Sequence, residues 1–232
     1  MQPGTDRHES VQRLPVKVCG ITRPEDGLMA WQAGASALGF IFYPPSPRFI
    51  SPEQAAQVVA ELPPEAVKVG VFVGATPEEM NHAVALCRLN WVQLHGGEPA
   101  EMIGQLDCPA YRAFRLKEQA DVELVAAAPD DLVLLDTFDP DHYGGTGRPF
   151  NWEWARKLSA GRQVILAGGL TPENAVRAVE AAQPAGLDVS SGVEASPGIK
   201  DAAKVARFFE ALREAGYSGA SPWSVKHGST KH

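Results

Sequence analysis

The chain has 232 residues, of which 44% are hydrophobic and 21% are charged, and its formal net charge is −7. This is the composition of an ordinary globular protein, and its acidic balance argues against nucleic acid as a partner, because nucleic-acid binders usually present a basic face. The three cysteines form no CxxC pair and the six histidines show no ligand spacing, so we predict neither a disulfide framework nor a metal site.

The two ends of the chain differ in character from the part between them. Residues 1–15 are polar and contain Pro3 and Pro15, so we expect a flexible N-terminal extension, and residues 217–232 predict a flexible C-terminal tail. Residues 16–216 are expected to form one catalytic domain. No apolar run reaches the roughly 18 residues of a membrane span, and the N-terminal residues lack the apolar core of a signal peptide. We therefore expect a soluble, cytoplasmic protein with no membrane partner.

Short apolar segments recur along residues 16–216, and each predicts a strand that is buried on both faces, because apolar residues run continuously along it. The segments are residues 16–19, 37–42, 67–73, 91–94, 110–115, 132–135, 163–167 and 186–189.

Helix-start signals follow several of these strands. Thr22 and Glu25 have the spacing of a capping box, and the helix that follows should end at Gly34. Ser51, Thr76 and Thr171 each precede a proline, which is the arrangement of an N-cap followed by the first helical residue. Shorter helices are expected from about residues 99, 118 and 152, and a last helix over residues 201–215.

Alternating strands and helices of this number fit either a closed barrel or an open doubly wound sheet. No GxGxxG motif follows the first strand, and polar residues or glycines follow nearly every strand. A ring of active loops at one mouth explains that pattern better than a single crevice does. We therefore predict an α/β fold, the (β/α)8 or TIM barrel, as a single domain.

The barrel prediction brings several polar strand ends to one mouth. Gly168-Gly169 and Ser191-Gly192 end two adjacent strands, and the bare backbone N–H groups of such loops are suited to a phosphate. The expected cradle consists of Gly168, Gly169, Ser191 and Gly192, with Gly145 and Gly147 of the 144–147 loop as a third wall. By itself, a glycine at a strand end often marks only a turn.

Cys19 and Asp136 end the first and sixth predicted strands and are the candidate base and acid. A thiol needs a positive or hydrogen-bonding neighbour to act as a thiolate at neutral pH. A base and an acid on either side of a sugar phosphate suit a proton-moving isomerisation without a cofactor. The residues alone leave open that Cys19 is a small buried hydrophobe and that Asp136 only caps its strand.

The sequence resembles the phosphoribosylanthranilate isomerase family over residues 16–214. The motifs that carry the resemblance are VKVCGITRPED (16–26), ALGFIFYPPSPRFIS (37–51), VGVFV (69–73), VQLHGGE (92–98), LLDT (134–137), GGTGRPFNW (144–152), ILAGGLTPENA (165–175) and GLDVSSGVEASPGIKD (186–201). They span seven of the eight predicted strand ends in order.

The resemblance implies a (β/α)8 barrel and a cofactor-free Amadori rearrangement in tryptophan biosynthesis. The substrate would be N-(5'-phosphoribosyl)anthranilate and the product 1-(2-carboxyphenylamino)-1-deoxyribulose 5-phosphate. Cys19 resembles the general base that removes the sugar C2 proton, and Asp136 the general acid that opens the ring. Arg48 resembles the residue that holds the anthranilate carboxylate, for which a guanidinium fork is suited; the alternative for Arg48 is a surface salt bridge.

The resemblance also places the phosphate at the glycine cradle and adds His95 and Asp188 to the substrate pocket, His95 as a wall. It assigns no firm role to Asp188 or to Glu194. We favour a monomer over a homodimer.

Three other functions remain as rivals. A phosphosugar barrel enzyme could use a Schiff base on Lys17, which shares strand parity with Cys19, or on Lys68. The dual-substrate isomerase of histidine and tryptophan synthesis relies on two aspartates, whereas this chain has Cys19 at the first strand end. A phosphosugar-binding regulator would bind without turnover, and the presence of both Cys19 and Asp136 argues against it.

Overall fold

The computed structural model describes residues 11–136 and 152–219, and its centre is a closed barrel of parallel strands in the order β2-β3-β4-β5-β6-β7-β8-β9. This confirms the predicted (β/α)8 architecture. The barrel strands are β2 (Val16–Cys19), β3 (Ala37–Ile41), β4 (Val67–Phe72), β5 (Trp91–Leu94), β6 (Ala110–Arg115), β7 (Leu132–Asp136), β8 (Gln163–Leu166) and β9 (Gly186–Val189).

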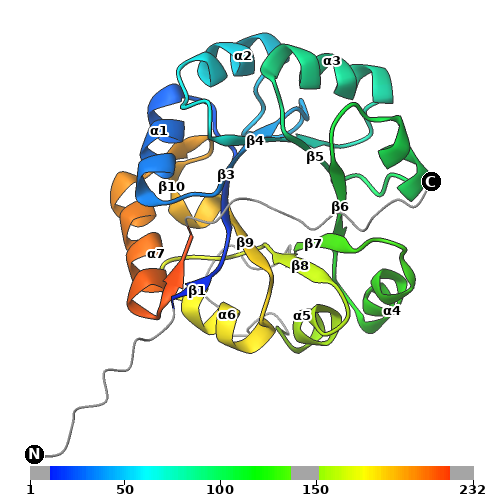
Figure 1. Ribbon diagram of the computed structural model, residues 1–232, viewed down its shortest axis with the longest axis vertical. Coiled ribbons are helices and arrows are strands. Elements are labelled where there is room, and N and C mark those ends of the chain that lie inside the picture. The colour runs from blue at the N-terminus through cyan, green and yellow to red at the C-terminus, as the bar shows by residue number, and fades with distance from the viewer. Residues whose placement is uncertain (1–10, 137–151, 220–232) are drawn as a thin grey trace, which may run out of the picture.

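The helices form an outer ring around these strands (Figure 1). They are α1 (Pro24–Ala33), α2 (Pro52–Ala60), α3 (Pro77–Cys87), α4 (Gln119–Ala127), α5 (Trp152–Ser159), α6 (Ala175–Ala182) and α7 (Ala202–Glu214), with the 3-10 helices η1 (Ala100–Gln105) and η2 (Ser191–Val193). Within residues 11–136 and 152–219, no helix combines the length and the apolar character that crossing a bilayer demands.

The strands bury both faces, as their continuous apolar sequences predict. Outward side chains such as Val18 and Leu166 pack against the helices. Inward side chains such as Val69, Leu134 and Ile165 form a second cluster inside the barrel. Because successive strand residues alternate between the faces, every second residue of a strand points toward the barrel axis. This alternation decides which polar strand-end residues can meet at the mouth.

Of the four predicted N-caps, two are confirmed and two are wrong. Ser51 and Thr76 each cap their helix through a complete capping box. Thr22 does not cap α1, because its hydroxyl donates to the Gly198 carbonyl at 2.5 Å. Thr171 lies before a turn, and α6 begins only after Asn174, whose Oδ1 accepts from the Thr171 N–H at 2.8 Å. At Thr22 a tertiary hydrogen bond takes the hydroxyl that the cap would use, whereas the Thr171 hydroxyl accepts from the Glu173 N–H at 3.3 Å within the turn.

Two small sheets lie outside the barrel and were not predicted. β1 (Gln12–Arg13) pairs in parallel with β12 (Tyr217–Ser218), so these residues belong neither to a loose extension nor to a loose tail. Leu14, next to β1, is buried in the main core and anchors the pair. Residues 1–10 and 220–232, on which the rest of that prediction depends, lie outside the described residues. β10 (Glu194–Ser196) and β11 (Ile199–Lys200) form a hairpin after η2.

Candidate functional site

Cys19 and Asp136 end two strands of the same barrel and lie at its C-terminal mouth. Asp136 shares the inward parity of Leu132 and Leu134, and Cys19 pairs in register with Gly39. In the ring of strands, β8 and β9 separate β2 from β7. The Cys19 residue is 6% exposed and the Asp136 side chain 20%. The predicted acid and base therefore share one end of the barrel.

The thiol of Cys19 faces a buried ammonium group inside the barrel. Lys17 Nζ forms an ion pair with Asp188 Oδ2 at 2.8 Å, and the Lys17 side chain has no exposed surface. A Cβ atom at Gly39 would lie 2.7 Å from Cys19 Sγ and 3.1 Å from Lys17 Nζ. Glycine at position 39 thus leaves the space in which the thiol and the ammonium group approach each other.

The charges around Cys19 act on its proton in opposite directions. Burial raises the pKa of the Cys19 thiol, and the nearby Lys17 ammonium lowers it, with the pKa above its ordinary value on balance. Burial by itself lowers the pKa of Lys17, but the facing acidic groups, Asp188 above all, raise it above its usual range. Lys17 is therefore a permanent cation beside a neutral thiol, in a position to stabilise the thiolate when the proton leaves.

Asp136 is the end point of a chain of polar side chains inside the barrel. His95 Nε2 lies 3.3 Å from Asp136 Oδ2, and Arg115 Nε lies 3.9 Å from the same oxygen. Gln93 Nε2 lies 2.9 Å from His95 Nδ1, and the Tyr111 hydroxyl donates to Gln93 Oε1 at 3.1 Å. Gln93 and Asp136 therefore contact opposite nitrogens of the His95 ring, which places His95 beside the proposed acid.

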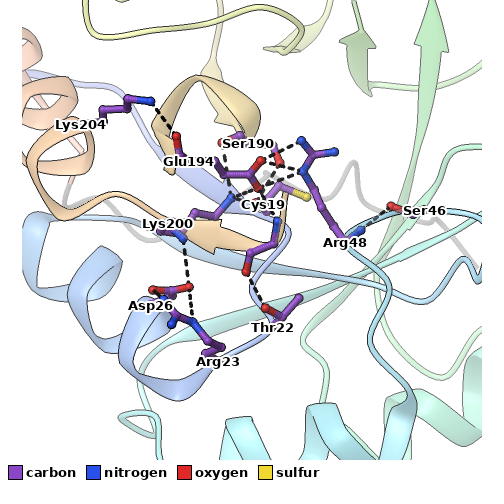
Figure 2. A network of polar contacts seen from close by, with 11 residues as sticks. Cys19, Thr22, Arg23, Asp26, Ser46, Arg48, Ser190, Glu194, Lys200 and Lys204 are labelled. Atoms are coloured by element: carbon purple, nitrogen blue, oxygen red, sulfur yellow. Dashed lines mark hydrogen bonds and ion pairs between the residues drawn. The ribbon is translucent and has the colours of Figure 1, made fainter. Parts of the chain in front are cut away.

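Arg48 reaches the mouth from the loop after β3. Its side chain crosses the end of β2, where a Cβ atom at Gly20 would lie 2.8 Å from Arg48 Cδ, so only glycine fits. Arg48 makes a bidentate ion pair with Glu194, with Nε–Oε1 at 2.9 Å and Nη2–Oε2 at 2.8 Å (Figure 2). The arginine side chain is 21% exposed and the glutamate side chain 4%. This is a largely buried pair, unlike the surface salt bridge weighed as the alternative.

The loops that carry Gly168-Gly169 after β8 and Ser191-Gly192 after β9 lie side by side, as the phosphate prediction requires. A Cβ atom at Gly192 would lie 1.8 Å from the Leu170 carbonyl oxygen, so the two loops are in direct backbone contact. Gly168 and Gly169 have φ values of +82° and +62°, which favour glycine. Gly145 and Gly147 lie outside the described residues. The phosphate-binding role of all these residues stays a prediction.

Neither lysine of the Schiff-base alternative is placed as an amine nucleophile. Lys17 is held as a cation by Asp188. Lys68 has the opposite parity to the inward-facing Val69, and its Nζ lies 3.5 Å from the Pro64 carbonyl oxygen, away from the mouth. Burial lowers the pKa of Lys68, but a reactive amine there could not reach a substrate held beside Cys19.

Several polar residues of the site were missed by the sequence reasoning. Gln93 and Tyr111 belong to the chain that ends at Asp136, and Lys200 lies under Cys19. The period of two along a strand could have pointed to Gln93, because it has the parity of His95. Nothing local points to Lys200, because its strand is short and lies outside the barrel.

Two further observations concern a cavity elsewhere in the molecule and the grouping of side chains that could hold a metal ion. A cavity of about 450 Å³, lined in part by Leu14, Gln183 and Tyr217, lies at the opposite end of the strands and contains none of these residues. Among residues 11–136 and 152–219, no three His, Cys, Asp or Glu side chains are grouped closely enough to hold a metal ion.

Comparison with known proteins places this geometry in a family. The sequence model of the N-(5'-phosphoribosyl)anthranilate isomerase family matches residues 16–211 of this chain. The N-(5'-phosphoribosyl)anthranilate isomerase of Trichlorobacter lovleyi is 46% identical over 203 residues, which cover 87% of this chain and 99% of the relative. The enzyme of that name from Geobacter sulfurreducens is 48% identical over 193 residues, covering 83% and 95%.

Solved structures agree with the sequence relatives. The crystal structure of phosphoribosyl anthranilate isomerase from Thermotoga maritima has a TM-score of 0.80 and 40% identity, covering 87% of this chain and 99% of that one. A phosphoribosyl anthranilate isomerase in complex with reduced 1-(o-carboxyphenylamino)-1-deoxyribulose 5-phosphate has a TM-score of 0.77 and 38% identity, with the same coverage.

Proposed function

Because the chain belongs to the N-(5'-phosphoribosyl)anthranilate isomerase family, we propose that Cys19 and Asp136 are the base and the acid of its reaction. The enzyme is an intramolecular aldose–ketose isomerase of tryptophan biosynthesis. It converts N-(5'-phosphoribosyl)anthranilate into 1-(2-carboxyphenylamino)-1-deoxyribulose 5-phosphate. The observation that supports the assignment of residues is the position of both side chains at one mouth of the closed barrel.

The proposed reaction moves one proton at each residue. Asp136 gives a proton to the ring oxygen as the C1–O bond breaks, and the anthranilate nitrogen donates its lone pair to form an iminium ion. Cys19, as thiolate, then takes the C2 proton, and the C–H electrons form a C1–C2 double bond while the iminium electrons return to nitrogen. The resulting enolamine tautomerises to the ketone. No external oxidant or reductant is needed, because C1 is reduced as C2 is oxidised.

The substrate has two anionic ends, and the mouth has a proposed position for each. Arg48 is suited to the anthranilate carboxylate, since a guanidinium group binds carboxylates through paired N–H donors. The adjoining loops of Gly168, Gly169, Ser191 and Gly192 are suited to the phosphate, because backbone N–H groups there can approach an anion closely. Both ends would then fix the sugar carbons between the thiol and the carboxyl group.

The partner of the enzyme is a small molecule. A monomeric state and a cytoplasmic location stay predictions from the sequence. Sedimentation velocity of the purified chain tests the monomeric state, since a homodimer would sediment faster and give twice the monomer mass.

The activity itself is tested by fluorescence. Phosphoribosylanthranilate carries the fluorescence of the anthranilate ring, and rearrangement is expected to quench it. We expect purified protein to abolish the signal of freshly made substrate in a time-dependent reaction that produces the deoxyribulose phosphate. A signal that decays no faster than the spontaneous loss of substrate would contradict the proposed function.

Replacing Lys17 by methionine is expected to shift the pH dependence of kcat/KM to higher pH. The charged groups that face Cys19 are Lys17, Asp188 and Lys200, and Lys17 is the cation with the largest effect on its pKa. Cys19 acts deprotonated, so kcat/KM rises with pH as the thiol loses its proton, and this rise is the acidic limb of the pH profile. Removing a cation raises the pKa of Cys19 and therefore moves this limb to higher pH. The unpaired Asp188 left behind acts in the same direction, so the sign is firm.

Two variants control this experiment. Asp188→Asn leaves Lys17 uncompensated and is expected to move the same limb to lower pH. Lys68→Met removes another largely buried lysine, which lies on the outer face of its strand, and should leave the limb in place. If Lys17→Met and Lys68→Met gave the same profile, Lys17 would have no electrostatic role at Cys19.

A further inference from the structure

The ammonium group of Lys200 joins the end of the strand that carries Cys19 to the β10–β11 hairpin. Lys200 Nζ donates to the Cys19 carbonyl at 2.5 Å, to the Ser190 carbonyl at 3.4 Å and to Glu194 Oε1 at 2.8 Å (Figure 2). Its side chain has no exposed surface. An ammonium group has three protons, and each has an acceptor here. Lys200 therefore links the end of β2 and the residue after β9 to the carboxylate of Glu194.

That carboxylate, Glu194, is also the partner of Arg48. Its two oxygens accept from Arg48 Nε and Nη2, so the plane of the guanidinium group is set by Glu194. Figure 2 shows the other terminal nitrogen of Arg48 pointing away from Glu194. The backbone carbonyl of Glu194 accepts in turn from Lys204 Nζ at 2.7 Å, which fixes the start of the hairpin.

The β10–β11 hairpin is held against α1 by hydrogen bonds. The Lys200 N–H donates to Asp26 Oδ2 at 3.1 Å, and Asp26 is 2% exposed and paired with Arg23. Thr22 donates to the carbonyl of Gly198 in the turn of the hairpin. The hairpin that carries Glu194 is thus held against α1, and the Glu194 carboxylate also accepts from Lys200 Nζ at 2.8 Å.

The charges of this group favour an anion at the mouth. Arg48 and Lys200 are two cations against the single anion Glu194, so the cluster keeps a positive charge even though Arg48 is paired. Burial alone raises the pKa of Glu194, but Arg48 and Lys200 bring it below its ordinary value, so the carboxylate is ionised. Glu194 therefore orients Arg48 without neutralising the cluster.

From these contacts we infer that Glu194 and Lys200 are positioning residues for the isomerisation. Glu194 fixes the guanidinium group of Arg48, and Lys200 links Glu194 to the carbonyl of Cys19. Together they hold the proposed carboxylate anchor and the proposed base at one spacing, so that binding of the anthranilate ring places C2 at the thiol. This inference rests on the proposed roles of Arg48 and Cys19.

The test is a binding cycle with two product analogues. One is reduced 1-(o-carboxyphenylamino)-1-deoxyribulose 5-phosphate, and the other lacks the aromatic carboxylate. We expect Glu194→Gln to weaken calorimetric binding of the first by about 10- to 100-fold and of the second by less than about 3-fold, because only the first engages Arg48. In an Arg48→Ala background, Glu194→Gln is expected to cause no further loss, since Glu194 acts through Arg48.

Kinetics separate the two positioning residues. Glu194→Gln is expected to act mainly on KM, whereas Lys200→Met, which frees the Cys19 carbonyl, is expected to lower kcat as well. Glu173→Gln is the matched control, because Glu173 also pairs with an arginine, Arg207, at 3.8 Å but is 66% exposed. The binding stoichiometry reports the folded fraction, so unfolding is distinguished from loss of affinity. Glu194→Asp keeps the charge, and it provides the same test if the glutamine variant does not fold.

Three results would overturn the inference: unchanged binding of the carboxylated analogue by Glu194→Gln, equal weakening of both analogues, or an additional loss in the Arg48→Ala background. Each would assign Glu194 a purely structural role. A wild-type protein that binds both analogues equally would instead contradict the proposed role of Arg48, whereas the fluorescence assay tests the isomerisation itself.

Discussion

Replacing Asp136 by asparagine, or Cys19 by serine, is expected to lower kcat by about 10²- to 10⁴-fold, the usual contribution of a general acid or base. Asparagine has nearly the shape of aspartate but carries no proton for the ring oxygen. The serine hydroxyl is far less acidic than a thiol, so it cannot accept the C2 proton as an anion. Because neither change alters the carboxylate or phosphate contacts, the dissociation constant of the reduced product analogue should remain within a few-fold of wild type.

Each variant has a matched control in the same chain. Asp131→Asn makes the same change at the amino end of the strand that ends at Asp136, on an exposed residue. Cys108→Ser makes the other change at a thiol whose pKa burial raises to about 11, away from the mouth. Both controls should retain wild-type kcat. A Cys19→Ser or Asp136→Asn enzyme with near-normal turnover would remove that residue from the mechanism.

Replacing Gly192 by alanine is expected to destabilise the barrel by about 3 kcal/mol and to weaken phosphate binding. The new Cβ atom would lie 1.8 Å from the Leu170 carbonyl oxygen and 2.8 Å from the Leu170 carbonyl carbon. These are backbone atoms, so no side-chain rotation relieves the overlap, and the loops after β8 and β9 must move apart. The free energy of unfolding in urea and the affinity for the reduced product analogue measure the two effects.

Gly161→Ala is the control for this substitution. A Cβ atom at Gly161 would meet no atom within 4 Å, and its backbone does not have the positive φ that favours glycine. Its free energy of unfolding should stay within about 1 kcal/mol of wild type. If Gly192→Ala were as stable as Gly161→Ala, the loops could separate at no cost, and the close contact between them would not hold the proposed phosphate site together.

The predicted elements agree with the structure where local sequence decides the outcome. The strands predicted at residues 16–19, 91–94, 110–115 and 186–189 are confirmed with the same bounds. Continuous apolar residues identify them because both faces of a barrel strand are buried. The helix starts at Ser51 and Thr76 follow from hydrogen bonds within three residues of the cap, so they too are local.

The predictions fail where a distant partner competes for a local group. The hydroxyl of Thr22 bonds to Gly198, which is 176 positions away in sequence. The sequence of the β10–β11 hairpin lacks the alternation of apolar and polar residues that predicts a strand. The hairpin is held by contacts of Lys200 with Asp26 and with the carbonyl of Cys19. None of these partners can be identified from neighbouring residues.

For the site, the order of residues along the chain was enough to name Cys19, Asp136 and the glycine loops, since parallel barrel strands bring their carboxyl ends to one mouth. The role of Arg48 was implied by the family resemblance. Strand periodicity and helix caps act over a few residues, and so the amino-acid sequence by itself determined the barrel and the candidates for chemistry. Only the tertiary structure decided the partners: the buried Lys17 beside the thiol, His95 beside Asp136, and Glu194 holding Arg48. These pairs depend on which side chains meet across the ring of strands, and that is settled by the closing of the barrel.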